Sequence, residues 1–293
     1  MLLPNAALLH VAQAKGYFAK QGLQVAIQVH PFGKPALTAL LEKRADLATC
    51  TQTPVVFAAL KGQRVSILAT ISESTRATAL IARADAGIAG PKDLGGRRIG
   101  VTSGSSGEFF LDTLLLRHRV ERSTVRIVNL PPDELADAIA NGELDAVVLW
   151  NPLLGATEKR LGGLARAFYV DDLYLETFDL VSRPDFVESH PLTIQRLLRG
   201  LVEADDLFAR APAEAKSAAL AEIGRGAPES LAGFDQFDFR IQLYESLLAL
   251  MDEEARWAIR GRLANRPATF NLLTAIDPGP LLEAKPDAVQ ILR

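Results

Sequence analysis

The spacing of apolar and polar residues changes several times along the first part of the chain, and each change predicts a new element. Apolar residues recur three or four positions apart over residues 6–15, which predicts a helix capped by Asn5. Residues 24–29 alternate with period two, the pattern of a half-buried strand. A turn at residues 33–35 places a proline to begin a second helix, which extends to about residue 43.

Strands and helices continue to alternate beyond this point. A short buried strand is predicted over residues 47–50, then a polar loop at 51–53, a helix from Pro54 and a strand over 65–69. Strands that alternate with helices of this length favour a parallel α/β sheet. The chain after Pro184 is instead mostly helical. Helices are predicted there at about residues 192–210, 214–222, 239–250 and 253–262.

A weak internal repeat adds to this picture. Residues 39–48 and 138–147 share the order helix, turn, aspartate and strand, and each then reaches a polar loop and a proline, at 51–54 and 150–152. Two α/β units built alike predict two lobes built alike. Because ligands of open α/β sheets bind beyond the carboxyl ends of the strands, both loops are expected to line one cleft.

The predicted fold is therefore a two-lobed α/β protein with an interlobe cleft. Short strands near residues 79–82 and 179–182 are expected to carry the chain between the lobes as two hinge crossings. The first lobe is predicted to contain residues 1–80 and 182–293, and the second lobe residues 81–181.

The segment at residues 100–108 carries the strongest functional signal. A strand feeds a helix there through small hydroxylated residues, which leaves unpaired backbone N–H groups at the helix N-terminus. The helix dipole adds partial positive charge, so the segment suits a carboxylate, sulfonate or phosphate. It matches neither a phosphate-binding loop nor a dinucleotide fingerprint. The alternative is that Ser105 or Ser106 merely caps the helix. Glu108 would repel an anion and is expected to point away from it; otherwise the ligand carries an amine.

Composition excludes several classes of protein. A net charge of −3 over 293 residues shows no excess of positive charge of the kind that nucleic-acid-binding proteins carry. The single cysteine, Cys50, excludes an intramolecular disulfide and a cysteine-based zinc site, and its apolar surroundings predict a buried thiol. No nucleophile, general-base or metal-ligand pattern is visible, so we predict no catalytic residue, no metal and no cofactor.

Taken in order, several short motifs resemble one family. Residues 12–23 match an A-x-x-x-GYF-x-x-x-GL pattern in the first helix, and weaker matches follow at residues 46–48, 91–101, 142–146, 150–152, 255–257 and 286–289. The chain resembles the periplasmic solute-binding proteins of ABC importers for nitrate, bicarbonate, taurine, alkanesulfonates and thiamine-pyrimidine precursors. The resemblance implies a type II periplasmic-binding-protein-like fold.

The resemblance completes a list of expected ligand-binding residues. His10 lies in the helix whose N-terminal end faces the cleft in that family, although a packing role is favoured for it. Trp150 is a cleft-lining residue or, alternatively, a core tryptophan. The expected ligand-binding residues are His10, Gln52, Thr53, Ser103, Ser105, Ser106, Gly107, Trp150 and Asn151.

The function implied is binding of a small organic, acidic solute by a monomer that delivers it to the membrane permease of an ABC importer, without chemistry. Two alternatives stay open: the ligand-sensing domain of a signalling protein, and an enzyme like the thiamine-pyrimidine synthase, whose cysteine-rich motif a single cysteine argues against. Only three residues precede Pro4, where the family has a strand. We therefore expect a periplasmic or lipid-anchored protein whose export segment is not in this chain, or a cytoplasmic protein if Met1 is the true start.

Overall fold

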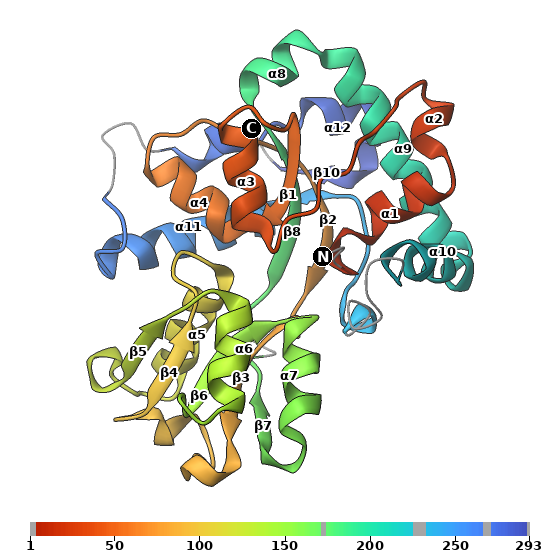
Figure 1. Ribbon diagram of the computed structural model, residues 1–293. Coiled ribbons are helices and arrows are strands. Elements are labelled where there is room, and N and C mark those ends of the chain that lie inside the picture. Colours follow the sequence, from red (N-terminus) through yellow and green to blue (C-terminus); the bar gives the residue numbers. More distant parts are fainter. Residues whose placement is uncertain (1–3, 171–173, 225–232, 266–270, 292–293) are drawn as a thin grey trace. The chain divides into compact units, whose positions relative to one another are not determined.

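The computed structural model describes residues 4–170, 174–224, 233–265 and 271–291 (Figure 1). The chain divides into two compact units. Unit 1 contains Met1–Glu73, Thr177–Leu231 and Asp238–Arg293, and unit 2 contains Ser74–Glu176 and Ala232–Phe237. The divisions at 73/74 and 176/177 lie a few residues before the predicted ones, and residues 232–237 belong with unit 2.

Unit 2 is built on a five-stranded sheet of order β5-β4-β6-β3-β7. Its strands are β3 (Thr78–Arg83), β4 (Arg98–Val101), β5 (Arg126–Asn129), β6 (Ala146–Trp150) and β7 (Ala165–Phe168). Strand β4 is parallel to β5 and β6, whereas β3 is antiparallel to β6 and β7. The expectation of a parallel sheet is therefore wrong for β3. Strand β3 is entered from β2 (Ser66–Ser74), which belongs to the sheet of unit 1, so no helical crossover within this sheet sets its direction.

Three helices accompany this sheet: α5 (Ser106–Arg117), α6 (Pro132–Ala140) and α7 (Leu153–Leu161). Alternate residues of β3 and β6, including Ile81 and Val147, form one fully buried cluster with Leu135 and Ile139 of α6. Helix α6 packs closely on β4 at Gly100, where an added Cβ atom would lie 2.4 Å from Leu135 Cδ2. Short 3-10 helices cover Ala84–Ala86, Pro91–Leu94, Arg122–Thr124, Gly162–Leu164 and Phe234–Gln236.

Unit 1 contains a three-stranded sheet of order β1-β8-β2, with β1 (Leu47–Thr51) antiparallel to β8 (Glu176–Ser182) beside β2 (Ser66–Ser74). A second pair joins β9 (Leu243–Tyr244) to β10 (Val289–Gln290). Both β2 and β8 continue by one residue into unit 2.

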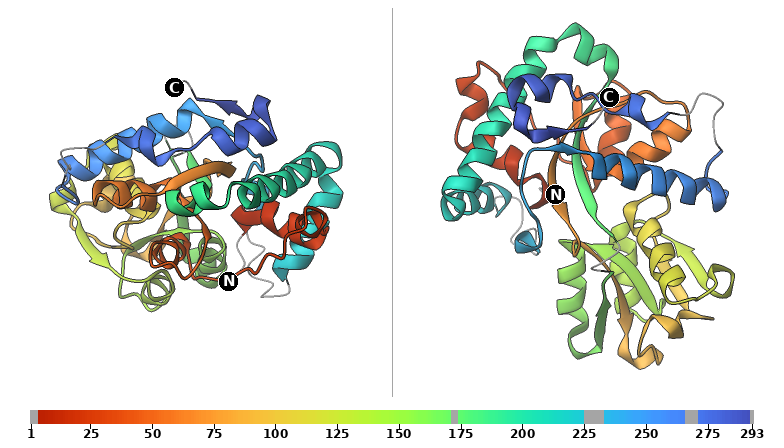
Figure 2. Two further views of the ribbon diagram at one scale, coloured as in Figure 1. Left: turned by 90° about the horizontal axis from the view of Figure 1, so that it is seen from above. Right: turned by 180° about the vertical axis from the view of Figure 1, so that it is seen from behind.

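The helices of unit 1 include the predicted ones with shifted ends. They are α1 (Ala7–Ala14), α2 (Tyr17–Lys20), α3 (Gly33–Leu41), α4 (Gln52–Leu60), α8 (Pro184–Ser189), α9 (Pro191–Arg210), α10 (Pro212–Gly224), α11 (Glu245–Arg260) and α12 (Gly279–Ala284). The short helices α2, α8 and α12 were not predicted. Helices α9 and α10 lie beside α1 (Figures 1 and 2). Short 3-10 helices cover Pro4–Ala6, Leu272–Ala275 and Pro286–Ala288.

Two predicted elements of unit 1 are corrected. Residues 24–29 form no strand, because their backbone has no ladder partner among the described residues, and Ile27 and Val29 are 38% and 52% exposed. The helices predicted at 239–250 and 253–262 are one helix, α11, which begins after the extended residues 238–244 bridge to β2 at Thr70 and Glu73.

Candidate functional site

The loop between β4 and α5 is held in shape by hydrogen bonds to the end of β5 and the residue after it. The Thr102 hydroxyl donates to the Leu130 carbonyl at 2.8 Å, and the Ser103 N–H donates to Asn129 Oδ1 at 2.9 Å. Gly104 takes a left-handed φ of 69°, which turns the chain into the helix. The N-terminus of α5 is therefore a fixed element, with Ser103 and Gly104 half-buried beside it.

Both predicted serines of α5 are buried. The Ser105 hydroxyl donates to the Thr102 carbonyl at 2.6 Å and makes no capping bond to the helix, so the alternative that Ser105 serves as its side-chain cap does not hold. Ser106 hydrogen-bonds the carboxyl group of Glu176. The Cβ atom of a larger residue at Gly107 would meet Val148 Cγ1 at 3.3 Å and Trp150 Cζ3 at 3.4 Å. The structure thus brings the first turn of α5 against the half-buried Trp150.

Glu108, which was expected to point away from a ligand, binds the loop itself. Its Oε2 atom accepts the Gly104 N–H at 2.8 Å, and its Oε1 atom accepts from Arg122 Nη2 at 3.0 Å. Arg122 also pairs with Asp112. Because the guanidinium lies against Glu108, the negative charge of this buried carboxylate is balanced within the unit.

Sequence reasoning missed Glu176, the most unusual acid of unit 2. It is 6% exposed, and its Oε2 atom accepts from the Thr78 hydroxyl at 2.7 Å, with Ser106 as a further hydrogen-bond partner and the Tyr174 hydroxyl close by. Burial raises the pKa of Glu176 to about 7, against the lowering effect of those three hydroxyls. An acid within an otherwise strand-forming run was the available signal.

Asn151 is engaged within unit 2. Its Nδ2 atom donates to Gln236 Oε1 at 2.6 Å, and its Oδ1 atom accepts the Gly155 N–H at 3.3 Å. The peptide bond from Asn151 to Pro152 is cis. The side chain is 3% exposed. Its hydrogen bond to Gln236 joins the loop after β6 to the segment that contains Gln236.

In unit 1, Gln52 and Thr53 begin α4 and are both fully buried. The Gln52 amide donates to Glu254 Oε1 at 2.9 Å and accepts from the backbone N–H and the hydroxyl of Thr177, each at 3.1 Å. The Thr53 hydroxyl has no hydrogen-bond partner within the described part of the chain. Of the two side chains, Thr53 therefore keeps spare hydrogen-bonding capacity.

The third predicted residue of unit 1, His10, lies in α1 and is 3% exposed. It lines a cavity of about 80 Å³ together with Ile27, Val29 and Thr49, and neither Gln52 nor Thr53 borders that cavity. His10 and the start of α4 thus belong to different surroundings.

A second buried acid, Asp179, continues the polar network of Gln52. The Thr70 hydroxyl donates to its Oδ1 atom at 2.6 Å, and the Thr177 hydroxyl donates to Oδ2 at 3.0 Å. Burial raises the pKa of Asp179 to about 7. Cys50, its neighbour across the ladder, is fully buried as predicted, and burial followed by the charge of Asp179 raises the pKa of its thiol well above the usual value.

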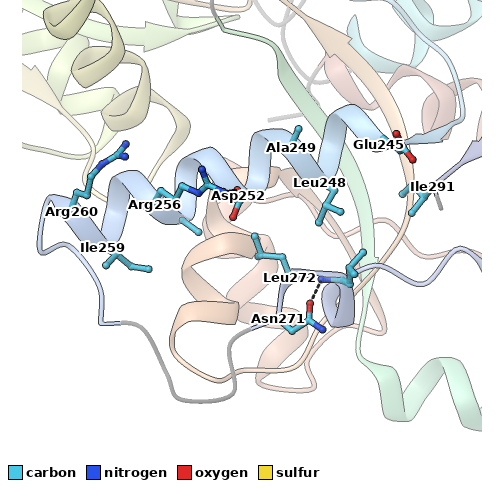
Figure 3. Close-up of a pocket in the computed structure, with 12 residues that line it drawn as sticks. Glu245, Leu248, Ala249, Asp252, Arg256, Ile259, Arg260, Asn271, Leu272 and Ile291 are labelled. Carbon is cyan, nitrogen blue, oxygen red and sulfur yellow. Dashed lines mark hydrogen bonds and ion pairs between the residues drawn. The ribbon is translucent and has the colours of Figure 1, made fainter. Parts of the chain in front are cut away.

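A larger groove of about 870 Å³ follows α11 in unit 1 (Figure 3). Leu248, Ile259 and Leu272 supply apolar surface to it, and Arg256 and Arg260 supply charge. None of the predicted ligand-binding residues lines this groove.

Across the described ranges, none of the helices combines the length and apolar character that crossing a membrane requires. Nor do the described residues contain a group of three or more histidine, cysteine, aspartate or glutamate side chains placed to hold a metal ion.

Comparisons with known proteins agree on one family. The profile described as "NMT1/THI5 like" matches residues 3–215. A Bacillus subtilis (strain 168) protein whose name assigns it to aliphatic-sulfonate binding is 30% identical over 65% of this chain and 59% of its own length. The taurine-binding periplasmic protein of Escherichia coli (strain K12) is 28% identical over 69% of this chain and 63% of its own length. The chain thus matches about three fifths of these relatives.

The fold has solved counterparts. The alkanesulfonate-binding protein SsuA from Xanthomonas axonopodis pv. citri, bound to MOPS, superimposes with a TM-score of 0.80 at 20% identity, covering 94% of this chain and 96% of its own. This likeness confirms the predicted periplasmic-binding-protein-like α/β fold. With the profile match covering most of the sequence, the chain belongs to the NMT1/THI5-like family.

Proposed function

We propose that this protein binds a small organic acid, with aliphatic sulfonates as the first class to test, and delivers it to the permease of an ABC importer from the periplasm or an equivalent extracellular position. The names of its relatives support the solute class and the location. The observation that carries the proposal is the loop from Thr102 to Gly107. Hydrogen bonds hold this loop, which ends in a helix N-terminus, and Arg122 balances the charge of Glu108, which accepts the Gly104 N–H.

In this proposal the solute's anionic group meets neutral donors. Ser103, Ser106 and the backbone of Gly107 contribute from unit 2, with Trp150 packing on the solute. The Ser105 hydroxyl, which donates to the Thr102 carbonyl, supports the turn that presents them. Thr53 contributes from unit 1 through its unpartnered hydroxyl. Gln52 and Asn151, whose amides are engaged by protein groups, act as supports, and His10 packs at α1. Selectivity then comes from fixed hydrogen bonds and not from one mobile counter-charge.

We further propose that the two units act as lobes, with the hinge where β2 and β8 pass from one unit to the other. A solute that contacts both lobes stabilises their closed arrangement, because that state alone offers the complete set of contacts. The protein is proposed to act as a monomer and to catalyse no reaction, so the solute should be recovered chemically unchanged.

Calorimetry with ethanesulfonate and taurine tests the proposal. Ser105→Ala and Ser106→Ala should each cost about 1–2 kcal/mol of binding, which is about five- to thirtyfold in Kd. Gly107→Val should cost more, because its side chain meets Val148 and Trp150 and blocks the backbone. Ser123→Ala, an exposed serine of the same unit, is the control. Unchanged affinity in all three site variants, with folding verified by thermal denaturation, would place the pocket elsewhere.

A further inference from the structure

Glu176 stands immediately behind the proposed anion-binding turn. It begins β8, and its carboxyl group reaches Thr78 of β3 at 2.7 Å and Ser106 in the first turn of α5. Tyr174, whose ring packs against Phe109 and Phe110, supplies the third hydroxyl. All of these groups lie within unit 2, and the carboxyl group of Glu176 is nearly inaccessible to solvent.

Within the described ranges, no charged side chain accounts for the raised pKa of this acid. From β3 and α5 it meets the hydroxyls of Thr78 and Ser106, and from its own segment it meets Tyr174, the one titratable group among the three. The neighbouring acid of α5, Glu108, is bound to Gly104 and Arg122, and the next acid of β8, Asp179, is bound to Thr70 and Thr177. The proton affinity of Glu176 therefore reflects burial opposed by hydroxyl donors.

A carboxyl group in these surroundings controls which way the Ser106 hydroxyl donates. When Glu176 is ionised it is only an acceptor, so the Ser106 O–H is directed at it. When Glu176 is protonated, its own O–H can donate to Ser106 Oγ. The serine proton is then available to another acceptor.

We propose that Glu176 is a specificity-determining residue that couples anion binding to proton uptake, making Ser106 a donor to the solute only when the glutamate is protonated. This inference rests on the function proposed above and adds a regulation to the same site. An ionised Glu176 also repels the solute's negative charge, so both effects act in the same direction.

The test is the Kd of ethanesulfonate measured by calorimetry from pH 5.5 to 8.5, a range in which the sulfonate stays ionised. Because protonated Glu176 favours binding, the Kd of the unaltered protein should rise as pH increases through about 7, by about tenfold across the range. Glu176→Gln should bind with little dependence on pH, since its neutral amide can still donate to Ser106. Asp179→Asn is the matched control, a buried acid of similar pKa whose hydrogen-bond partners are Thr70 and Thr177, and it should keep the full dependence.

A second variant keeps the test decisive if Glu176→Gln folds poorly. Thr78→Val removes one donor that lowers the pKa of Glu176, so the pH at which affinity changes should move upward. An unaltered pH profile in either folded variant would overturn the inference. Taurine binding that tightens as pH rises would also overturn it, since the carboxylate would then meet the solute's ammonium group. Absence of sulfonate binding at every pH would instead contradict the proposed function itself.

Discussion

At the scale of single residues, Gly233 and Asn151 restrict each other. Gly233 has a φ of 75°, and a Cβ atom there would lie 2.2 Å from Asn151 Nδ2. Asn151 has no room to withdraw, because its amide bonds both Gln236 and Gly155. The loop after β6 is thus fitted to a residue without a side chain.

Replacing Gly233 should therefore be more costly than backbone strain alone. Gly233→Ala is expected to lower the free energy of unfolding by about 2–4 kcal/mol, combining left-handed strain with overpacking. Gly62→Ala is the matched control, since Gly62 has a φ of 74° with nothing within 4 Å of an added Cβ atom. It should lose about 1 kcal/mol. Equal losses in urea denaturation would show that the contact with Asn151 relaxes freely.

At the scale of elements, the turn into α5 depends on Glu108. Glu108→Ala leaves the Gly104 N–H without its acceptor and should lower the free energy of unfolding by about 2 kcal/mol. Glu108→Gln should lose less, because an amide oxygen can still accept that N–H. Hydrogen exchange at the Gly104 amide should accelerate in the alanine variant and change little in the glutamine variant. Equal protection of this amide in both variants would contradict the assignment.

Local periodicity predicted the positions of several elements but not their partners in the fold. The helix at residues 6–15 and the strand at residues 47–50 follow from periodicity, and both are present with small shifts. The predicted cap is wrong, because Ala6 is the N-cap of α1 and the Asn5 Oδ1 atom has no hydrogen-bond partner among the described residues. Residues 24–29 carry an equally good strand pattern, yet pattern alone does not supply a neighbouring strand, and the segment stays unpaired. The direction of β3 was missed for the same reason, because it depends on a connection and not on composition.

The residues of the candidate site were likewise predictable from the sequence only in part. The small residues of the β4–α5 turn were visible as a motif, and the structure brings Gly107 against Trp150 as one local surface. Glu176 was not predictable, because its partner Thr78 lies 98 residues away and its burial is a property of the folded unit. Gln52 is expected to offer the solute an uncharged donor and acceptor, whereas the fold engages its amide with Thr177 and Glu254.

At the scale of the whole molecule, each unit contains a buried carboxyl group on β8, Glu176 in unit 2 and Asp179 in unit 1. Both have pKa values raised by burial to about 7, whereas the unfolded chain releases these protons near the ordinary values of 4.5 and 3.8. Below those pH values both carboxyl groups are protonated in the folded and in the unfolded chain, so they do not change the free energy of unfolding. As pH rises, the unfolded state loses its protons first, so the folded state loses relative stability until pH exceeds about 7.

The free energy of unfolding should therefore fall between pH 5 and pH 8, by about 3 kcal/mol for each of the two carboxyl groups. Glu176→Gln and Asp179→Asn should each remove part of this slope. The double variant should keep only the contribution of acids such as Glu73 and Glu158, whose pKa values burial also raises. Hydrogen bonds to Arg83 and Lys15 lower the pKa values of the exposed acids Asp85 and Glu214. These acids therefore titrate below pH 4.5, outside the window of the measurement. Urea denaturation at constant ionic strength supplies the comparison. A double variant that loses as much stability as the unaltered protein between pH 5 and pH 8 would show that these two acids are not the buried groups responsible.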